Sequence, residues 1–502
     1  MPKLHIKGHI LLIFMLILVL VLPFAQASAY LDPGTGSLLL SSLVAIFASF
    51  VYFFKGFFYK ITTGKITRKA LIGGGQKWLK HNRPTSFKSH TTTISQSISP
   101  SSLVIYGEDK RYYSLFKPII DALEKLQVPY TFYTSDENDP MLEHKSNIAE
   151  IKFIGTGTKA AMVLNTLQAD ICVLTTPQLD VLEIKRSKGV KHYCHILHST
   201  GHIELYEIFA IDYFDSVFVN SPIHTDFIRE VEQVRKLKAK QIEIVGCPYL
   251  DYLQDKLENL PKKTTQNSTP TILVAPSWGR ESILEKYGFA FLEPLLETGY
   301  FVIIRPHPQS YISQKDILDD LYQKTQKYKN LKWDNHIENI HAMAESDLMI
   351  GDFSGVLFDY IALFNKPLLT MKFSFNTVGY DLEDTSYLHN TWKDSALKDI
   401  SQSIESSDFK NIKSIIDSAL HDKTKLENRK KYKELLWYFP KQGGMQTALK
   451  LLQIHKDILE DELGDNLPVH NAILAISNVL NAESALISST NNIKDSTKGQ
   501  HK

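Results

Sequence analysis

Residues 346–364 read SDLMIGDFSGVLFDYIALF, and this stretch sets the pattern for much of the chain. The apolar run 348–350 predicts a short buried strand, and the mostly apolar run 356–364 predicts a helix. Between them, residues 351–355 include two glycines, a serine and an aspartate, which are typical of a tight turn. The stretch therefore predicts a strand, a turn and a helix in direct succession.

The same alternation of short apolar strands and helical patterns recurs on both sides of this stretch. The segments 113–126 and 159–167, for example, have the apolar spacing of helices. Apolar strands are predicted at 103–106, 130–133, 151–154, 170–174, 192–197, 216–219, 242–245, 271–275, 301–304, 348–350 and 367–370. Short buried strands that alternate with helices are typical of a parallel sheet covered by helices.

A polar stretch at 260–269 separates these strands into two series. We therefore expect an α/β protein with two doubly wound, Rossmann-like domains at 103–255 and 265–400, followed by C-terminal helices at 401–460. The length of 502 residues agrees with two or three domains.

The first part of the chain contains two apolar runs. Residues 1–29 combine a short basic start, the apolar run 10–24 and the small residues Ala27-Ser28-Ala29, the pattern of a signal peptide or of a first membrane helix. Residues 37–54 form a second apolar run without a charge, which predicts a transmembrane helix. The turn 31–36 is rich in helix breakers and separates the two runs. An interpretation of both runs as buried core helices is less favoured, because neither has a polar face.

A basic segment follows the second apolar run. Residues 55–102 form a juxtamembrane segment and linker, in which the part 55–88 has nine Lys and Arg and no acidic residue. Positively charged flanks stay on the cytoplasmic side of a membrane. The predicted location is therefore the cell membrane, with the large remainder of the chain facing the cytoplasm.

Composition and charge exclude several classes of protein. Hydrophobic residues make up 43% and charged residues 22% of the chain, as in globular proteins. The net charge of +1 gives no general attraction to nucleic acid, so no nucleic-acid partner is expected. Three scattered cysteines exclude a disulfide framework. The tail 488–502 is rich in Ser, Thr, Asn and Lys, which predicts disorder.

Four of the predicted strands end in polar residues that packing alone does not explain. These ends read HSTGH at 198–202, PSWGRE at 276–281, RPHP at 305–308 and GDFSG at 351–355. In doubly wound sheets, ligands bind beyond the carboxyl ends of the strands. The candidate functional residues are therefore expected at these four ends.

Two of the strand ends suit a phosphate. The turn 351–355 leaves backbone N–H groups unpaired at the start of a helix, where the helix dipole favours an anion. The alternative is that Ser354 only caps the helix. Prolines stiffen the loop 305–308, in which Arg305 can fork onto a phosphate and His307 can donate to one or carry a proton. A buried, hydrogen-bonded histidine without a catalytic role is the alternative for His307.

The strand end at 198–202 suits a general base. His198 follows a largely apolar strand, and Gly201 lets a substrate approach the backbone. A histidine is the usual base for a hydroxyl nucleophile near neutral pH. His202 competes for this role, as do His192 and His195 upstream. These four histidines also suggest a metal site, but strand alternation places His195 on the opposite face from His192 and His198, so no metal is expected.

Several motifs follow one another along the chain in a characteristic order. They are His198, 220–222 (NSP), 246–251 (GCPYLD), 275–278 (APSW), 305–308 (RPHP), 346–356 (SDLMIGDFSGV), 366–367 (KP) and 442–445 (QGGM). In order and spacing they resemble the CDP-glycerol glycerophosphotransferase family, whose members build the polyol-phosphate chains of teichoic acids. The resemblance covers about residues 100–455 and implies the two-domain fold called GT-B.

The resemblance also implies roles for the strand-end residues. His198 matches the general base of the family, and His307 matches its second essential histidine, near the pyrophosphate of the nucleotide donor. Ser354 with its neighbours matches the phosphate-binding helix start of the family. From the residues themselves we expect Arg305, Ser277, Trp278, Asp352, Ser354 and Gly355 to bind the donor, and Trp278 to stack on the cytosine ring. Gly201 and His202 are expected on the acceptor side.

The chain departs from the family pattern in two of these motifs. It has His198-Ser199-Thr200 where the family usually has His-Gly-Thr. It has Asp352-Phe353-Ser354-Gly355 where the family usually has Asp-Tyr-Ser-Ser. Both differences fall in the cleft that binds the substrates.

We therefore expect a membrane-anchored transferase that moves a polyol phosphate, most simply glycerol phosphate from CDP-glycerol, onto a hydroxyl of a lipid-linked or envelope glycan and releases CMP. His198 would remove the acceptor proton, while Arg305, His307 and the turn at Ser354 would neutralise the developing charge. No cofactor is expected. The alternatives are a GT-B glycosyltransferase or sugar-nucleotide epimerase with the same strand-end sites, and a non-catalytic envelope-assembly protein.

Overall fold

The computed structural model describes residues 98–201, 203–204, 206–260, 269–336, 338–372, 381–385, 392–462 and 467–498. The predicted segments 1–29 and 37–54, the basic segment up to residue 97, and His202 lie outside the described residues. Among the helices of the described residues, none combines the length and the apolar character needed to cross a bilayer.

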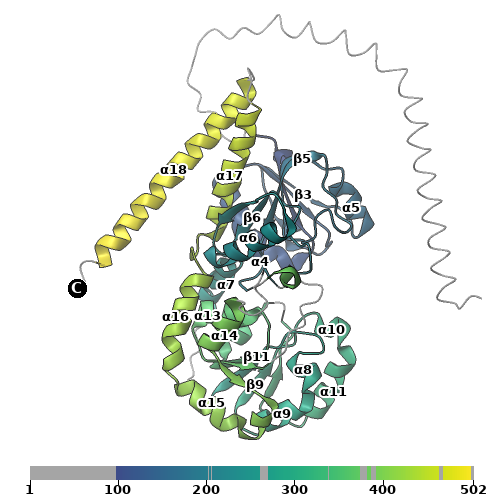
Figure 1. The fold of residues 1–502 in the computed structure, drawn as a ribbon, viewed down its shortest axis with the longest axis vertical. Helices are drawn as coiled ribbons and strands as arrows, with labels where there is room; N and C mark the ends of the chain where they lie inside the picture. Colours follow the sequence, from purple (N-terminus) through teal and green to yellow (C-terminus); the bar gives the residue numbers. More distant parts are fainter. Residues whose placement is uncertain are drawn as a thin grey trace, which may run out of the picture. The chain divides into compact units, whose positions relative to one another are not determined.

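The first seven strands form one parallel sheet in the order β3-β2-β1-β4-β5-β6-β7, and we call the part of the chain around it the first domain (Figure 1). The strands are β1 Leu103–Gly107, β2 Tyr130–Thr134, β3 Ala149–Phe153, β4 Gln168–Leu174, β5 Gly189–Ile196, β6 Ser216–Val219 and β7 Gln241–Ile244. Every residue of β1 and β6 is buried, which explains why their sequences show no polar alternation.

The other six strands form a second parallel sheet in the order β10-β9-β8-β11-β12-β13, and we call the part around it the second domain. The strands are β8 Thr271–Val274, β9 Phe301–Ile304, β10 Leu331–Trp333, β11 Leu348–Gly351, β12 Leu368–Met371 and β13 Gln402–Ile404. The predicted α/β fold with two parallel sheets is confirmed.

The sequence analysis misses the two edge strands of the second sheet, β10 and β13. Their sequences are LKW and QSI, and only one of the six residues is buried. A short edge strand has solvent on one side and therefore contains no apolar run that periodicity can detect. In addition, β13 lies at 402–404, where only helices were expected.

Helices connect the strands and follow the second sheet. Those of the first domain are η2 Pro100–Ser102, η3 Lys110–Tyr112, α4 Tyr113–Lys125, η4 Pro140–Glu143, α5 Thr158–Leu164, η5 Pro222–His224, α6 Thr225–Arg235 and α7 Pro248–Glu258. Those of the second domain are α8 Ile283–Lys286, α9 Gly288–Leu296, α10 Ser310–Ser313, α11 Lys315–Thr325, α12 Ile340–Glu345, α13 Val356–Phe364, η6 Asp381–Asp384, α14 Trp392–Ile400, η8 Ser406–Asn411, α15 Ile412–His421 and α16 Thr424–Leu436. The last two are α17 Gly443–Asp461 and α18 Leu467–Lys498.

The backbone of α18 is helical up to Lys498, where the sequence analysis predicts a disordered tail from residue 488 onward. The chain has no glycine or proline between Pro468 and Gly499. A polar composition without a helix breaker therefore does not by itself end a helix.

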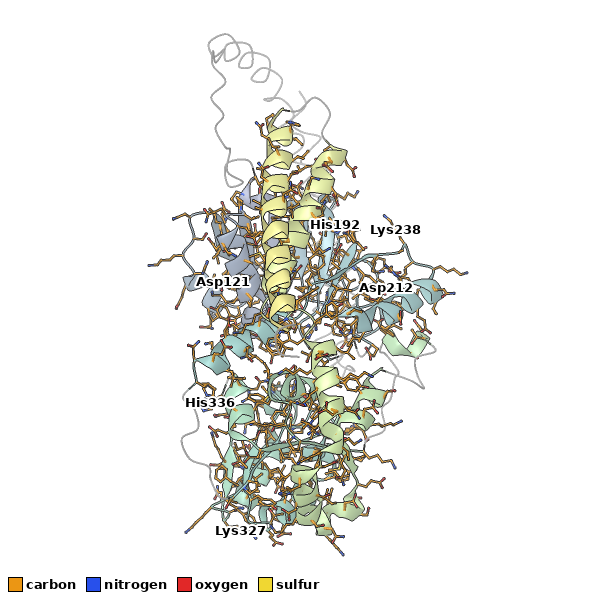
Figure 2. The ribbon with its side chains drawn as sticks, turned by 90° about the vertical axis from the view of Figure 1, so that its left-hand side faces the viewer. Asp121, His192, Asp212, Lys238, Lys327 and His336 are labelled. Atoms are coloured by element: carbon orange, nitrogen blue, oxygen red, sulfur yellow. The ribbon has the colours of Figure 1, made fainter. Side chains whose placement is uncertain are left out.

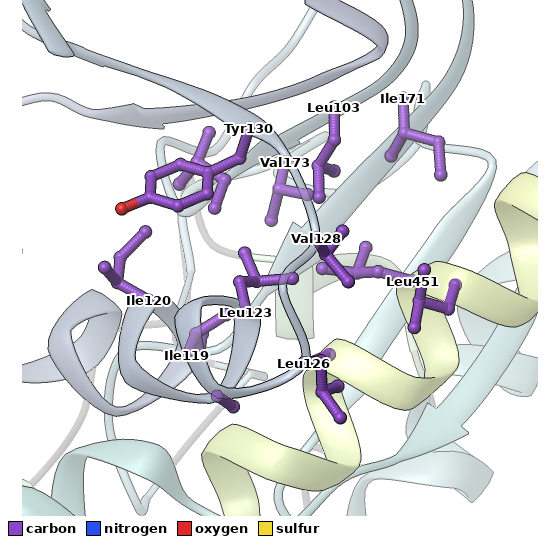
Figure 3. Packing of buried hydrophobic residues seen from close by; sticks show 14 of the residues in the cluster. Leu103, Ile119, Ile120, Leu123, Leu126, Val128, Tyr130, Ile171, Val173 and Leu451 are labelled. Carbon is purple, nitrogen blue, oxygen red and sulfur yellow. The ribbon is translucent and has the colours of Figure 1, made fainter. Parts of the chain in front are cut away.

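A helix from near the C-terminus completes the core of the first domain. Ile120 and Leu123 of α4 pack on Leu103 and Tyr130 of the first sheet, and Leu451 of α17 belongs to the same buried cluster (Figure 3). Full burial of one such aliphatic side chain is worth about 1.5–3 kcal/mol. The hydrophobic core of the first domain thus combines segments from distant parts of the chain.

Two glycines at the start of α17 allow it to approach this core closely. A Cβ atom on Gly444 would lie 2.2 Å from the carbonyl oxygen of Pro118 in α4. A Cβ atom on Gly443 would lie 2.8 Å from the backbone nitrogen of Pro248 in α7. Only residues without a side chain fit at these two positions.

A buried carboxylate joins α7 to the segment that leads into α17. Asp251 accepts hydrogen bonds from Trp437 Nε1 and from the backbone N–H groups of Lys441 and Gly443, each over 2.7 Å. Burial raises the pKa of Asp251 to about 6, although these hydrogen bonds act in the opposite direction.

Candidate active site

His198 lies just beyond the carboxyl end of β5, and its Nδ1 is held by two hydroxyl groups. The Oγ1 atom of Thr175 lies 3.1 Å and the hydroxyl oxygen of Tyr206 lies 3.2 Å from Nδ1. The ring of Tyr206 is nearly parallel to the imidazole, and the edge of Tyr112 faces it at 5.4 Å between centroids. Within the described part of the chain, Nε2 has no hydrogen-bond partner. The tautomer that donates Nδ1–H to a hydroxyl therefore leaves the Nε2 lone pair for a substrate proton.

The pKa of His198 is lowered to about 4, first by burial and then by the positive charge of Arg111. Both effects disfavour a charged imidazole. The ring is therefore neutral at pH 7, as a general base must be.

The competing histidines of the first domain have different surroundings. His192, labelled in Figure 2, lies within β5 with its Nε2 atom 3.0 Å from Ser216 Oγ. His195 is fully buried, packs on Phe214, and has no hydrogen-bond partner for either ring nitrogen. Burial lowers the pKa of both histidines, that of His195 to about 3. Of the described histidines of the first domain, only His198 lies just beyond the carboxyl end of β5.

His307 lies in the loop after β9, in the second domain. The backbone N–H of Gln309 donates to its Nδ1 over 3.1 Å. Because Nδ1 accepts, the ring proton of the neutral form is on Nε2, which can donate to a ligand oxygen. Burial, followed by the charge of Arg111, lowers the pKa of His307 to about 4. Trp278, whose side chain is 46% exposed, lies beside this ring at 6.4 Å between centroids.

Arg305 has a partner within the chain. Its Nη1 atom lies 2.5 Å from Oδ2 of Asp334, and the two side chains are 12% and 1% exposed. Asp334 directly follows β10, one of the strands that the sequence analysis misses. The carboxylate of Asp334 already compensates the charge of Arg305. The expected bidentate contact of Arg305 with a phosphate would therefore compete with this ion pair.

The carboxylate of Asp352 also binds within the chain. It accepts hydrogen bonds from the backbone N–H groups of Ser277 at 2.8 Å, Phe353 at 2.7 Å and Ile283 at 3.0 Å. These bonds tie the loop that carries Ser277 and Trp278 to the end of β11. Asp352 thus positions the loop on the expected donor side, while its oxygen atoms face backbone groups.

The start of α13 is the clearest anion cradle among the described residues. The helix has no side-chain cap, so the alternative in which Ser354 caps it is not observed. In the described part of the chain, the backbone N–H groups of Ser354, Gly355 and Val356 have no hydrogen-bond partner. Unpaired N–H groups at a helix start can bind an anion without any charged side chain.

The loop of His198 contacts this helix start directly. A Cβ atom on Gly201 would lie 3.6 Å from Phe358 and 3.7 Å from the Cα atom of Gly355. The hydroxyl of Thr200 donates to the carboxylate of Asp359, a buried residue of α13 whose pKa is raised to about 6 by burial. Gly201, expected on the acceptor side, therefore lies at the contact between the His198 loop and the anion cradle.

The first domain also supplies a cation that the sequence analysis does not identify. Arg111 lies in η3, just beyond the carboxyl end of β1, with its side chain 63% exposed. Its Nε and Nη2 atoms donate to the carboxylate of Asp109 at 2.9 and 2.5 Å. Nη1 has no partner among the described residues. The charge of Arg111 acts on both His198 and His307, which come from different domains. The rule that led to the other strand ends applies equally to β1 and would have found this residue.

No group of three or more His, Cys, Asp or Glu in the described residues is arranged to hold a metal ion.

The chain is similar to one protein family and to several solved structures. The chain matches the family model of the CDP-glycerol:poly(glycerophosphate) glycerophosphotransferases over residues 108–404. Among solved structures, the wall teichoic acid polymerase TagF is similar at 16% identity and a TM-score of 0.48, with 74% of this chain and 92% of that chain covered. A UDP-GlcNAc 2-epimerase from Methanocaldococcus jannaschii is similar at 14% identity and a TM-score of 0.46, with 71% and 99% covered. Among curated proteins, none matches the chain.

The family match spans more than half of the chain, including β2 to β7 of the first sheet and all six strands of the second sheet. It includes His198, His307, Arg111 and the start of α13. The chain therefore belongs to the CDP-glycerol:poly(glycerophosphate) glycerophosphotransferase family and is a transferase of that type.

Proposed function

We propose that this transferase moves glycerol phosphate from CDP-glycerol to a hydroxyl group of a lipid-linked or envelope glycan. The acceptor oxygen attacks the distal phosphorus, the bond from that phosphorus to the bridging oxygen breaks, and CMP leaves with the bridging oxygen. The acceptor proton passes to His198. The observation that carries the proposal is the direct contact between the loop of His198 and the start of α13, made at Gly201 and by the hydrogen bond from Thr200 to Asp359.

His198 acts as the general base through Nε2. Thr175 and Tyr206 hold the ring through Nδ1, so that the proton-accepting nitrogen keeps a fixed direction. A bound diphosphate brings negative charge close to the imidazole, which favours its protonated form. The pKa of His198 therefore rises from about 4 toward neutrality when the nucleotide donor binds, which strengthens the base at the moment of reaction.

The charge on the transferring phosphate is neutralised from both domains. Nε2–H of His307 and the N–H groups at the start of α13 donate from the second domain. In this proposal Arg111 of the first domain, whose charge acts on both histidines, contacts the same phosphate. Fixed hydrogen-bond donors of this kind stabilise a phosphoryl transition state because they need no reorganisation. The ring of Trp278 offers a surface for the cytosine base.

The proposal includes membrane attachment through residues 1–54, with the domains on the cytoplasmic side. Nine uncompensated positive charges at 55–88 support this orientation. A reporter fused after Leu103 should be active only in a form that works in the cytoplasm. Activity of an exported reporter at this position would overturn the orientation.

The decisive experiment measures product release from the purified full-length protein. CDP-glycerol, other CDP-polyols and nucleotide sugars are offered with a crude envelope-lipid acceptor fraction. We expect CMP from CDP-glycerol and only background release in His198→Ala. Release of UDP from a nucleotide sugar would indicate a glycosyltransferase or epimerase instead. Absence of nucleotide binding altogether would indicate a non-catalytic assembly protein.

A further inference from the structure

A separate cavity of about 260 Å³ opens at the carboxyl edge of the first sheet. It lies at the ends of β1 and β2 and at the start of α5. The residues that line it are Tyr106, Glu108, Asp109, Ser135, Thr156, Gly157, Ala160, Ala161, Glu183 and Ile184. At about 30 Å³ for each water molecule in the liquid, the cavity has room for roughly nine waters, enough for a small polyol or one sugar ring. None of the residues placed on the nucleotide-donor side lines it.

The wall of the cavity suits hydroxyl groups rather than phosphates. Glu108, Asp109 and Glu183 contribute carboxylates, and among the described lining residues there is no Lys or Arg. The hydroxyls of Tyr106 and Ser135 form a buried pair with 2.8 Å between their oxygen atoms. Carboxylates accept hydrogen bonds from hydroxyl groups but repel anions.

The charges of this wall are only partly compensated. Arg111 pairs with Asp109, and Lys110, which does not line the cavity, lies 3.9 Å from Asp136. Glu108 receives a hydrogen bond from the hydroxyl of Thr176 over 3.0 Å. Negative charge therefore remains on the wall, mainly at Glu108 and Glu183.

The cavity is connected to the proposed base through a short chain of contacts. Glu108 lines the cavity and binds Thr176, and the preceding residue Thr175 contacts Nδ1 of His198. Asp109 lines the cavity and holds Arg111, and the following residue Tyr112 contacts the ring of His198. Two independent routes thus place this cavity next to the residues that orient the base.

Resting on the proposed function, we infer that this cavity binds the uncharged, hydroxyl-bearing unit of the acceptor, a polyol or a sugar ring. Phosphate groups of the acceptor stay outside the cavity, because its carboxylates repel them. The terminal hydroxyl then points along the first sheet edge toward His198.

Binding is tested with the full-length protein in a detergent that contains no sugar, by saturation-transfer NMR. The probes are glycerol, methyl glucoside, glycerol 3-phosphate and inorganic phosphate. We expect signals from at least one neutral probe, and about fivefold weaker binding of glycerol 3-phosphate than of glycerol. Stronger binding of the phosphate-bearing probes, or no signal from either neutral probe, would overturn the inference.

Three variants locate the binding. Ala161→Leu fills the cavity and should abolish the signal of the neutral probe. Met162→Leu is the matched control on the same helix, because Met162 is 60% exposed and does not line the cavity. Glu183→Lys, at an exposed position, should raise binding of glycerol 3-phosphate about fivefold. An unchanged signal in both Ala161→Leu and Glu183→Lys would place the probe elsewhere.

Binding of CDP separates this inference from the proposed function. CDP should bind equally to the wild type and to all three variants. Failure of the wild type to bind CDP would contradict the proposed transfer reaction, while a neutral-probe signal that Ala161→Leu removes would still support the cavity.

Discussion

The carboxyl edges of the two sheets present polar groups in opposite ways. At the first edge, the polar side chains are positioned by other side chains. The hydroxyl of Tyr206 contacts Nδ1 of His198, and the guanidinium of Arg111 donates to the carboxylate of Asp109. At the second edge, the backbone dominates. The start of α13 presents N–H groups that have no partner in the described residues, and the carboxylate of Asp352 is occupied by backbone N–H groups.

This difference separates two chemical tasks. A network of side chains can change a pKa and take up a proton, whereas a cradle of backbone N–H groups binds an anion at any pH. The geometry thus favours proton transfer at the first edge and phosphate binding at the second. His307 is the exception at the second edge, since a backbone N–H fixes its tautomer and leaves Nε2 as a hydrogen-bond donor.

The largest effect is expected from the base. His198→Ala should lower kcat by about 10²–10⁴-fold, the usual contribution of a positioned general base. The affinity for CDP should hardly change, because the proposed phosphate contacts belong mainly to the second edge. His192→Asn is the control, since His192 lies within β5, the strand that leads to His198, and its Nε2 atom contacts Ser216 Oγ. A greater loss in His202→Ala than in His198→Ala would reverse the assignment of the base.

The next effect concerns stability at the second edge. Arg305→Ala removes the arginine partner of the buried carboxylate of Asp334, which should lower the free energy of unfolding by about 3–5 kcal/mol in urea denaturation. The double variant Arg305→Ala/Asp334→Asn should recover part of this loss. If folded Arg305→Ala instead keeps its stability and binds CDP more weakly, the arginine belongs to the anion cradle.

Arg111 tests whether the first edge also takes part in phosphate binding. Arg111→Ala should lower kcat/KM by about 10–150-fold, which corresponds to about 1.5–3 kcal/mol for a hydrogen bond to a charged group. The same variant should raise the pKa values of His198 and His307, which NMR titration of histidine resonances can follow. Lys110→Ala, in the same helical turn, should leave both measurements unchanged. Unchanged histidine titrations in Arg111→Ala would show that the arginine lies too far away to act on them.

The smallest effect concerns pH. His198 and His307, the two histidines of the proposed mechanism, have pKa values lowered to about 4, so in the free protein they stay neutral well below pH 6.5. The acidic limb of kcat/KM should therefore begin near pH 5 rather than near 6.5. The histidines favour the folded state above pH 6.5, and this contribution is lost as the pH falls from 6.5 toward 4. An inflection of kcat/KM near pH 6.5 would contradict the buried environment of both rings.

Much of this arrangement follows from local sequence patterns. The central strands are apolar throughout because helices cover both of their faces, so a run such as 348–350 predicts its strand directly. The strand-end rule then leads to His198, to His307 and to the turn at Ser354. Each of these is recognisable within a few residues of its strand.

Other features depend on contacts between distant residues. The partner of Arg305 is Asp334, 29 residues later and next to an edge strand without an apolar pattern. Thr175 lies 23 residues before His198, directly after β4. No local pattern reports such pairs, because the sheet order brings them together only in the folded chain. For the same reason, Asp352 looks like a ligand in the sequence and binds backbone groups in the structure.

The position of α17 has a consequence for synthesis of the protein. Helix α17 supplies Ala448, Leu451 and Leu452 to the core beneath β1 and α4, yet the ribosome makes it after the whole second domain. Translation adds about 5–20 residues per second, so α17 is made roughly 10–40 s after the first sheet that it covers. During that interval an apolar face of the first domain stays uncovered and can bind chaperones or other unfolded chains. The order of the segments along the chain thus sets the delay between synthesis of the first sheet and synthesis of the helix that completes its core.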